Sequence, residues 1–226
     1  MRVDVAFTPA ETAAAPLGIV VDVLRATSTI AQALAAGYRR VYCCSEIDQA
    51  RTLRESLGEG LLGGEREALR IDGFDVGASP REFLEPRAET LILSTTNGTR
   101  TILTAAERCD EVVLGSLLNL GAVAAYARER GDDVALLCSG FKGAFALDDA
   151  YCAGRIVRLL DAERSDAAVA ADLLAGSFAT ALDGLQARTY GPPGLEEDIR
   201  FCAREDVLDV VPRLVGMIRG AAEIAV

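Results

Sequence analysis

Histidine is absent from this chain of 226 residues. The Ser-His-Asp triad, the Cys-His dyad, the phosphohistidine phosphatases and the histidine-rich binuclear metal sites all need an imidazole, so the sequence excludes them. Lysine occurs once, as Lys142, among 23 basic residues, whereas 34 residues are acidic and the net charge is −11. This balance argues against nucleic acid as a partner, because phosphate backbones need a basic surface.

Long apolar runs and paired cysteines are also missing. No run approaches the roughly 20 residues that span a bilayer, and the segment from Met1 to Glu11 lacks the apolar core of a secretory signal. The six cysteines form no C-x-x-C pair, which is typical of reduced thiols in a protein core. We therefore expect a cytoplasmic protein without a membrane anchor.

Short apolar runs alternate with helical stretches along the chain, which predicts an α/β fold with a mainly parallel sheet. The expected strands are residues 3–7, 17–23, 41–44, 90–94, 111–114 and 134–138. The expected helices are residues 29–36, 47–57, 99–108, 118–130, 148–160 and 167–183. Gly37, Gly58 and Gly131 follow three of these helices, where a left-handed cap favours glycine.

The last quarter is less regular. The Gly-Pro-Pro-Gly turn within residues 190–194 must interrupt the preceding element, an acidic helix is expected to start near residue 195, and a strand at 207–211 should stop at Pro212. We expect one domain over residues 1–226. The alternative is a smaller C-terminal lobe from about residue 185, giving two closely packed lobes.

The first polar cluster follows the expected strand at 17–23, on the loop side where open α/β sheets bind ligands. Asp22 could bind a hard cation or attack phosphorus, and Arg25 could hold an anion. Thr27 and Ser28 open the next helix, so hydroxyls and free backbone N–H groups would converge there. The alternative is that Ser28 is an ordinary helix cap and Asp22 a turn residue.

Two further clusters combine glycine with polar groups. Gly63-Gly64-Glu65-Arg66 is expected as a loop that offers a cation ligand beside an anion clamp, or else as a surface turn. The segment Thr95-Thr96-Asn97-Gly98-Thr99-Arg100 joins a strand to a helix and is suited to holding an anion, although it is not a P-loop. An Asn-Gly turn with Thr99 as the helix cap is the alternative.

A last cluster, Cys138-Ser139-Gly140-Phe141-Lys142, is followed by Asp148 and Asp149 at a helix start. A Cys-x5-Arg phosphatase loop is excluded, because Ala144 stands where arginine is required. One of the two aspartates is expected to face the site, but not both, since they are adjacent. Carboxylate ligands favour Mg²⁺ over Zn²⁺, so the clusters together predict Mg²⁺-assisted chemistry on a small phosphorylated anion.

At these residues the sequence resembles the 2-phosphosulfolactate phosphatase family. The strings that carry the resemblance are Val21 to Thr29, Gly63 to Arg66, Gly73 to Pro80, Thr95 to Thr99, Cys138 to Gly140, Asp149 to Gly154 and Leu195 to Asp198. They occur in order between about residues 3 and 212. One departure is Ala78, where the family string G-N-S-P has asparagine.

The resemblance implies a Mg²⁺-dependent phosphatase with a three-layer α/β/α fold. Its substrate would be (R)-2-phospho-3-sulfolactate, hydrolysed to 3-sulfolactate and phosphate on the way to coenzyme M. Two alternatives stay open: a phosphatase of another small phosphorylated hydroxy acid, and a non-catalytic anion- or nucleotide-binding protein. We expect no partner other than the small anionic substrate, and leave a homodimer open.

On this basis we assign hypothetical roles. Asp22, Glu65 and Asp149 are the expected catalytic groups, and Asp22 and Glu65 would hold Mg²⁺. The expected substrate-binding residues are Arg25, Thr27, Ser28, Arg66, Thr95, Thr96, Asn97, Gly98 and Thr99. Attack by water is favoured over an aspartyl phosphate, since Leu24 replaces the second aspartate of the D-x-D-x-T motif.

Overall fold

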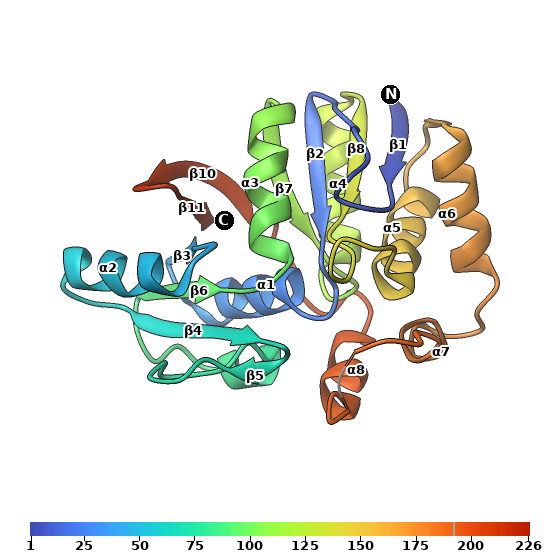
Figure 1. Ribbon diagram of the computed structural model, residues 1–226. Helices are drawn as coiled ribbons and strands as arrows, with labels where there is room; N and C mark the ends of the chain where they lie inside the picture. Colours follow the sequence, from blue (N-terminus) through green and yellow to red (C-terminus); the bar gives the residue numbers. More distant parts are fainter. Residues whose placement is uncertain (192) are drawn as a thin grey trace.

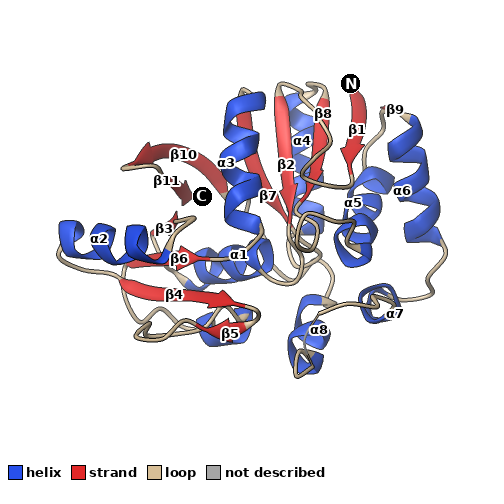
Figure 2. Ribbon diagram, in the orientation of Figure 1, coloured by secondary structure: helices blue, strands red, loops and turns tan. Residues whose placement is uncertain are grey.

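The computed structural model describes residues 1–191 and 193–226, and within them eleven strands form one sheet (Figures 1 and 2). The strands are β1 (Arg2–Ala6), β2 (Leu17–Val21), β3 (Arg40–Cys43), β4 (Leu61–Arg66), β5 (Leu69–Arg70), β6 (Thr90–Ser94), β7 (Glu111–Gly115), β8 (Val134–Cys138), β9 (Glu163–Arg164), β10 (Arg213–Ile218) and β11 (Ala221–Ala225). Their order is β5-β4-β6-β3-β11-β10-β7-β2-β8-β1-β9. Most neighbouring strands are parallel, as expected.

Helices cover both faces of the sheet, which confirms the α/β class and is consistent with three layers (Figure 1). They are α1 (Ala26–Ala36), α2 (Ile47–Leu57), α3 (Gly98–Arg108), α4 (Leu120–Arg130), α5 (Leu147–Leu159), α6 (Asp166–Gly176), α7 (Ala181–Gln186) and α8 (Glu196–Cys202), with a 3₁₀ turn at Pro80–Phe83. Alternate residues of β2 enter opposite cores: Ile19 and Val21 pack with α4 and α5, and Val20 packs with α1 and α3. Burial on both faces explains why these strands are continuous apolar runs.

The chain end forms a hairpin, β10–β11, in the middle of the sheet between β3 and β7 (Figure 1). The strand expected at 207–211 is therefore wrong: this segment is a loop, and the strand starts after Pro212 instead of stopping there. The backbone N–H groups of Val207 and Leu208 donate to Leu118 and hold the segment outside the sheet. The division into one domain or two stays a prediction.

Two other expectations need correction. The helix expected at 167–183 is two helices, α6 and α7, because Thr180 and Asp183 form a capping box that starts a new helix. The segment Gly63–Arg66 is part of strand β4 rather than a loop. Glycine is required there, since a Cβ on Gly64 would lie 2.3 Å from the carbonyl oxygen of Ser94.

Most other expected elements are present with ends shifted by at most a few residues. Gly37, Gly58 and Gly131 have φ values of 113°, 74° and 71° and end α1, α2 and α4, as predicted. Over residues 1–191 and 193–226, no helix is both long enough and apolar enough to span a membrane.

Candidate active site

Loops from both sides of the C-terminal hairpin meet around a cavity of about 900 Å³. Strands β2 and β8 contribute loops from one side, and β4 and β6 from the other. Four carboxylates from three separate parts of the chain line the cavity: Asp22, Glu65, Asp148 and Asp149. The carboxyl ends of parallel strands are the usual ligand site of such sheets, so the sequence clusters do converge.

Asp22 directly follows β2 and is 7% exposed. Its Oδ1 accepts the N–H of Ala26 at 3.3 Å, and the backbone N–H of Gly98 also donates to this carboxylate. A Cβ on Gly98 would lie 2.6 Å from Asp22 Oδ2, so glycine allows α3 to start against the carboxylate. Burial, followed by the negative charges of Asp148 and Glu65, raises the pKa of Asp22 to about 7.

Asp148 and Asp149 open helix α5, and both line the cavity, so the expectation that only one could face it is wrong. Asp149 accepts the N–H groups of Val23 at 2.9 Å and Gly140 at 3.0 Å, which ties the loop after β2 to the loop after β8. Asp148 accepts the hydroxyl of Tyr190 and the N–H of Asp149. Burial raises the pKa of both aspartates.

Glu65 connects β4 to the hydroxyl-bearing loop after β6. Its Oε1 accepts the N–H and the hydroxyl of Thr96, each at 2.8 Å, and its Oε2 accepts the N–H of Ala68 at 2.8 Å. These bonds fix the carboxylate at the cavity wall. Oε2, which accepts a single hydrogen bond, retains a lone pair that could face a cation.

The loop after β6 leads into the N-terminus of α3, as the sequence predicts. Thr95, Thr96 and Asn97 line the cavity, while Thr99 is buried behind them with its hydroxyl 3.1 Å from that of Thr95. The helix cap is Asn97 rather than Thr99, and the Asn97 side chain makes no capping bond. The first two N–H groups of α3 are already engaged, since Gly98 donates to Asp22 and Thr99 donates to the Thr95 hydroxyl oxygen at 3.4 Å. Gly98 and Thr99, which were expected to bind the substrate, do not line the cavity.

The two arginines expected to hold the substrate both line the cavity but are engaged by the protein. Arg25 forms a buried ion pair with Asp198 at 2.6 Å. Arg66 donates to the carbonyl oxygens of Glu65, Ser94 and Ser45 and to the Ser94 hydroxyl. These contacts fix both guanidinium groups in the cavity wall, where each contributes a positive charge.

Thr27 and Ser28 are completely buried, and their hydroxyls donate to the carbonyl oxygens of Asp22 and Val23. The structure thus places both side chains in the turn that shapes the Asp22 loop rather than in the cavity wall. Ala78, where the family string has asparagine, does line the cavity.

Phe141 and Lys142 of the last cluster line the cavity, and sequence reasoning missed Arg188 and Tyr190, which line it too. The ring of Tyr190 stacks on Phe141 with 4.8 Å between centroids, and its hydroxyl binds Asp148. The adjacent Gly-Pro-Pro-Gly turn was the available signal for this segment. That turn includes residue 192, which lies outside the described residues.

The donor set suits a hard divalent cation. The aspartates share one cavity, and the repulsion between them raises the pKa of Asp22 and of Asp149 after the effect of burial. A bound cation would relieve that repulsion, and carboxylate oxygens are the ligands that Mg²⁺ prefers. No group of three or more acidic, cysteine or histidine side chains is already arranged as a metal site in the described part of the chain.

Comparison with known proteins identifies the family of this chain. The family model for 2-phosphosulpholactate phosphatase matches residues 5–216. A probable 2-phosphosulfolactate phosphatase of Carboxydothermus hydrogenoformans is 38% identical over 223 residues, covering 94% of this chain and 92% of the relative. One of Synechococcus sp. is 40% identical over 214 residues, covering 87% and 88%. The chain therefore belongs to the 2-phosphosulpholactate phosphatase family.

Proposed function

We propose that this protein is a Mg²⁺-dependent phosphatase that hydrolyses (R)-2-phospho-3-sulfolactate to 3-sulfolactate and phosphate, a step towards coenzyme M. The observation that carries the proposal is the convergence of Asp22, Glu65, Asp148 and Asp149 beside the N-terminus of α3 in one cavity. Family membership supports the substrate.

Asp22 and Glu65 would hold Mg²⁺ from opposite sides of the hairpin. Mg²⁺ would neutralise the carboxylates and polarise the phosphoryl oxygens. The Thr95 hydroxyl and the partial positive charge at the N-terminus of α3 would stabilise the phosphoryl group as its charge spreads in the transition state.

Without histidine, the leaving alkoxide needs another proton source. The buried pair Asp148 and Asp149 is suited to this role, because a raised pKa keeps a carboxyl protonated closer to neutral pH. Both Asp149 oxygens accept backbone N–H groups, whereas Asp148 accepts the Tyr190 hydroxyl and one N–H on a single oxygen. Asp148 is therefore the better placed of the two to present a proton.

A second candidate substrate is another small phosphorylated hydroxy acid. Ala78 favours it, because the cavity wall carries a methyl group where the family string has an amide. An anion-binding protein without activity is the remaining alternative. The four converging carboxylates argue against it, since a binder of anions gains nothing from gathering negative charge.

The test is phosphate release from 2-phosphosulfolactate with Mg²⁺, with EDTA, and with Mg²⁺ restored. We expect turnover that EDTA abolishes and Mg²⁺ restores, and a loss of at least about tenfold in Glu65→Gln, about 1.4 kcal/mol. The matched control is Glu55→Gln, an exposed position on α2. A folded protein that binds phosphate but releases none would favour the binding protein.

A further inference from the structure

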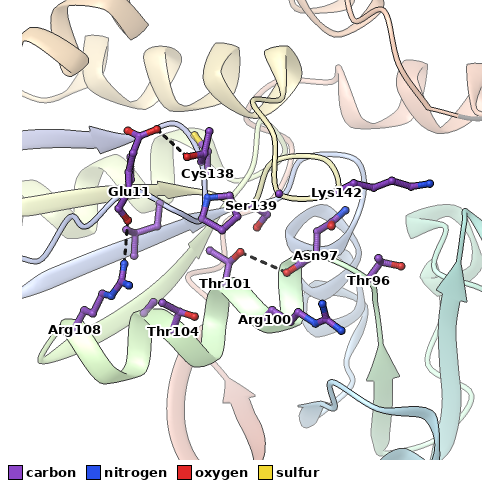
Figure 3. A pocket seen from close by; sticks show the side chains of 16 residues that line it. Glu11, Thr96, Asn97, Arg100, Thr101, Thr104, Arg108, Cys138, Ser139 and Lys142 are labelled. Carbon is purple, nitrogen blue, oxygen red and sulfur yellow. Dashed lines mark hydrogen bonds between the residues drawn. The ribbon is translucent and has the colours of Figure 1, made fainter.

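A second cavity of about 390 Å³ adjoins the first, and Figure 3 shows the side chains that line it. The two cavities share Thr96, Asn97 and Lys142 in their walls. The carboxylates of the first cavity do not line the second, whose floor is apolar and includes Ala6 and Leu137. The second cavity is therefore suited to a different kind of ligand from the first.

One face of α3 gives this cavity a positive wall. Arg100, Thr104 and Arg108 are spaced four residues apart on the helix and all line it, with Lys142 beyond the helix start (Figure 3). The one acidic side chain in the wall is Glu11, whose carboxylate accepts from the Thr8 hydroxyl at 2.9 Å and a backbone N–H. Outside the wall, Glu46 lies 3.9 Å from Arg100 and Glu67 lies 3.4 Å from Lys142, and a bound anion would compete with these exposed and therefore weak ion pairs.

Ser139, at the end of β8, supplies an independent sign of a ligand. It is 1% exposed, and its hydroxyl has no hydrogen-bond partner within residues 1–191 and 193–226. Figure 3 shows it on the side of the cavity that faces Asn97 and Thr101 of the α3 start. Because a buried hydroxyl without a partner costs about 1–3 kcal/mol, an acceptor supplied by a ligand would satisfy it.

We propose that this second cavity binds a small molecule carrying a tetrahedral oxyanion, held by the Ser139 hydroxyl and Arg100, with its organic part, if any, on the apolar floor. Inorganic phosphate and a sulfonate share this chemistry, and both would be released by the proposed reaction. The bound oxyanion would lie next to Thr96, whose N–H and hydroxyl hold Glu65. The second site would thus contact the loop that shapes the first.

The experiment is equilibrium dialysis of the full chain, treated with EDTA, against radiolabelled inorganic phosphate. We expect a saturable site that Arg100→Gln and Ser139→Ala each weaken by at least about fivefold, because a charge-assisted or otherwise unpaired hydrogen bond is lost. Arg87→Gln, at an exposed position that lines neither cavity, should leave binding unchanged. Thermal unfolding checks that each variant is folded.

Addition of unlabelled 3-sulfolactate separates the two sources. Displacement of phosphate from the Arg100-sensitive site supports a sulfonate as the ligand, and persistence of phosphate supports phosphate itself. Phosphate binding that is absent, or equal in wild type, Arg100→Gln and Ser139→Ala, overturns the proposal. A protein that shows this binding but no turnover would refute the proposed function and keep the second site.

Discussion

Replacing Asp22 by asparagine should inactivate the enzyme and, at alkaline pH, stabilise the metal-free fold. A carboxyl whose pKa rises from 3.8 in the unfolded chain to about 7 in the fold destabilises the ionised form by about 4 kcal/mol. Asparagine removes that charge and keeps an oxygen for the N–H of Ala26. We expect Asp22→Asn to be about 2–4 kcal/mol more stable than wild type at pH 8.5 without Mg²⁺.

The direction in which stability changes with pH follows from the direction of the pKa shift of Asp22. Because folding raises the pKa of Asp22, the stability that its protonation contributes is complete below about pH 4 and is lost as the pH rises through about 7. Wild type should therefore lose stability over this interval, while Asp22→Asn loses less. Near pH 5, where the Asp22 carboxyl is protonated in the fold, the two proteins should differ by only about 1 kcal/mol.

Urea unfolding in EDTA at pH 5 and pH 8.5 measures this difference, and phosphate release with Mg²⁺ measures activity. Activity should fall at least about 100-fold, or about 2.7 kcal/mol. A variant less stable than wild type at pH 8.5 would refute the electrostatic reasoning. Activity above about a tenth of wild type would remove Asp22 from catalysis.

Three further predictions follow from packing and burial. Gly98→Ala places a Cβ 2.5 Å from the Cβ of Ala26, so it should cost about 1–3 kcal/mol in urea unfolding and most of the activity, whereas Gly216→Ala, whose Cβ meets no atom within 3.5 Å, should be far milder. Arg25→Met should cost about 1–3 kcal/mol, because Asp198 loses its 2.6 Å ion pair and keeps Arg81, at 3.7 Å, as its charged partner. Adding Asp198→Leu should restore part of the loss. Cys109 should react first with a thiol reagent, since the other cysteines are buried; equal rates for all six would contradict this.

The strands and most helices could be predicted because their signals are local. Apolar runs marked β2, β6 and β8, and Gly37, Gly58 and Gly131 marked helix ends. The C-terminal hairpin could not, because β10 has no fully buried residue. The hairpin obtains its place from the pairing of β10 with β7 and of β11 with β3, both far away in the sequence. Pairing between strands that are far apart in the sequence cannot be predicted from a short segment of either strand.

Part of the site was also predictable from local signals in the sequence. Asp22 and the loop from Thr95 to Thr99 follow strands directly, so the parallel sheet brings them to one edge. The engagement of Arg25 by Asp198, 173 residues later, and the stacking of Tyr190 on Phe141 depend on tertiary contacts. Side-chain type alone cannot tell an arginine that is free for substrate from one already paired.

The most direct test of the central claim is the ratio of kcat/KM for 2-phosphosulfolactate to that for 2-phospholactate, which lacks the sulfonate, at saturating Mg²⁺. We predict Mg²⁺-dependent hydrolysis with a preference of at least about tenfold for the sulfonate, or about 1.4 kcal/mol. Equal kcat/KM values would keep the phosphatase and contradict 2-phosphosulfolactate as its substrate.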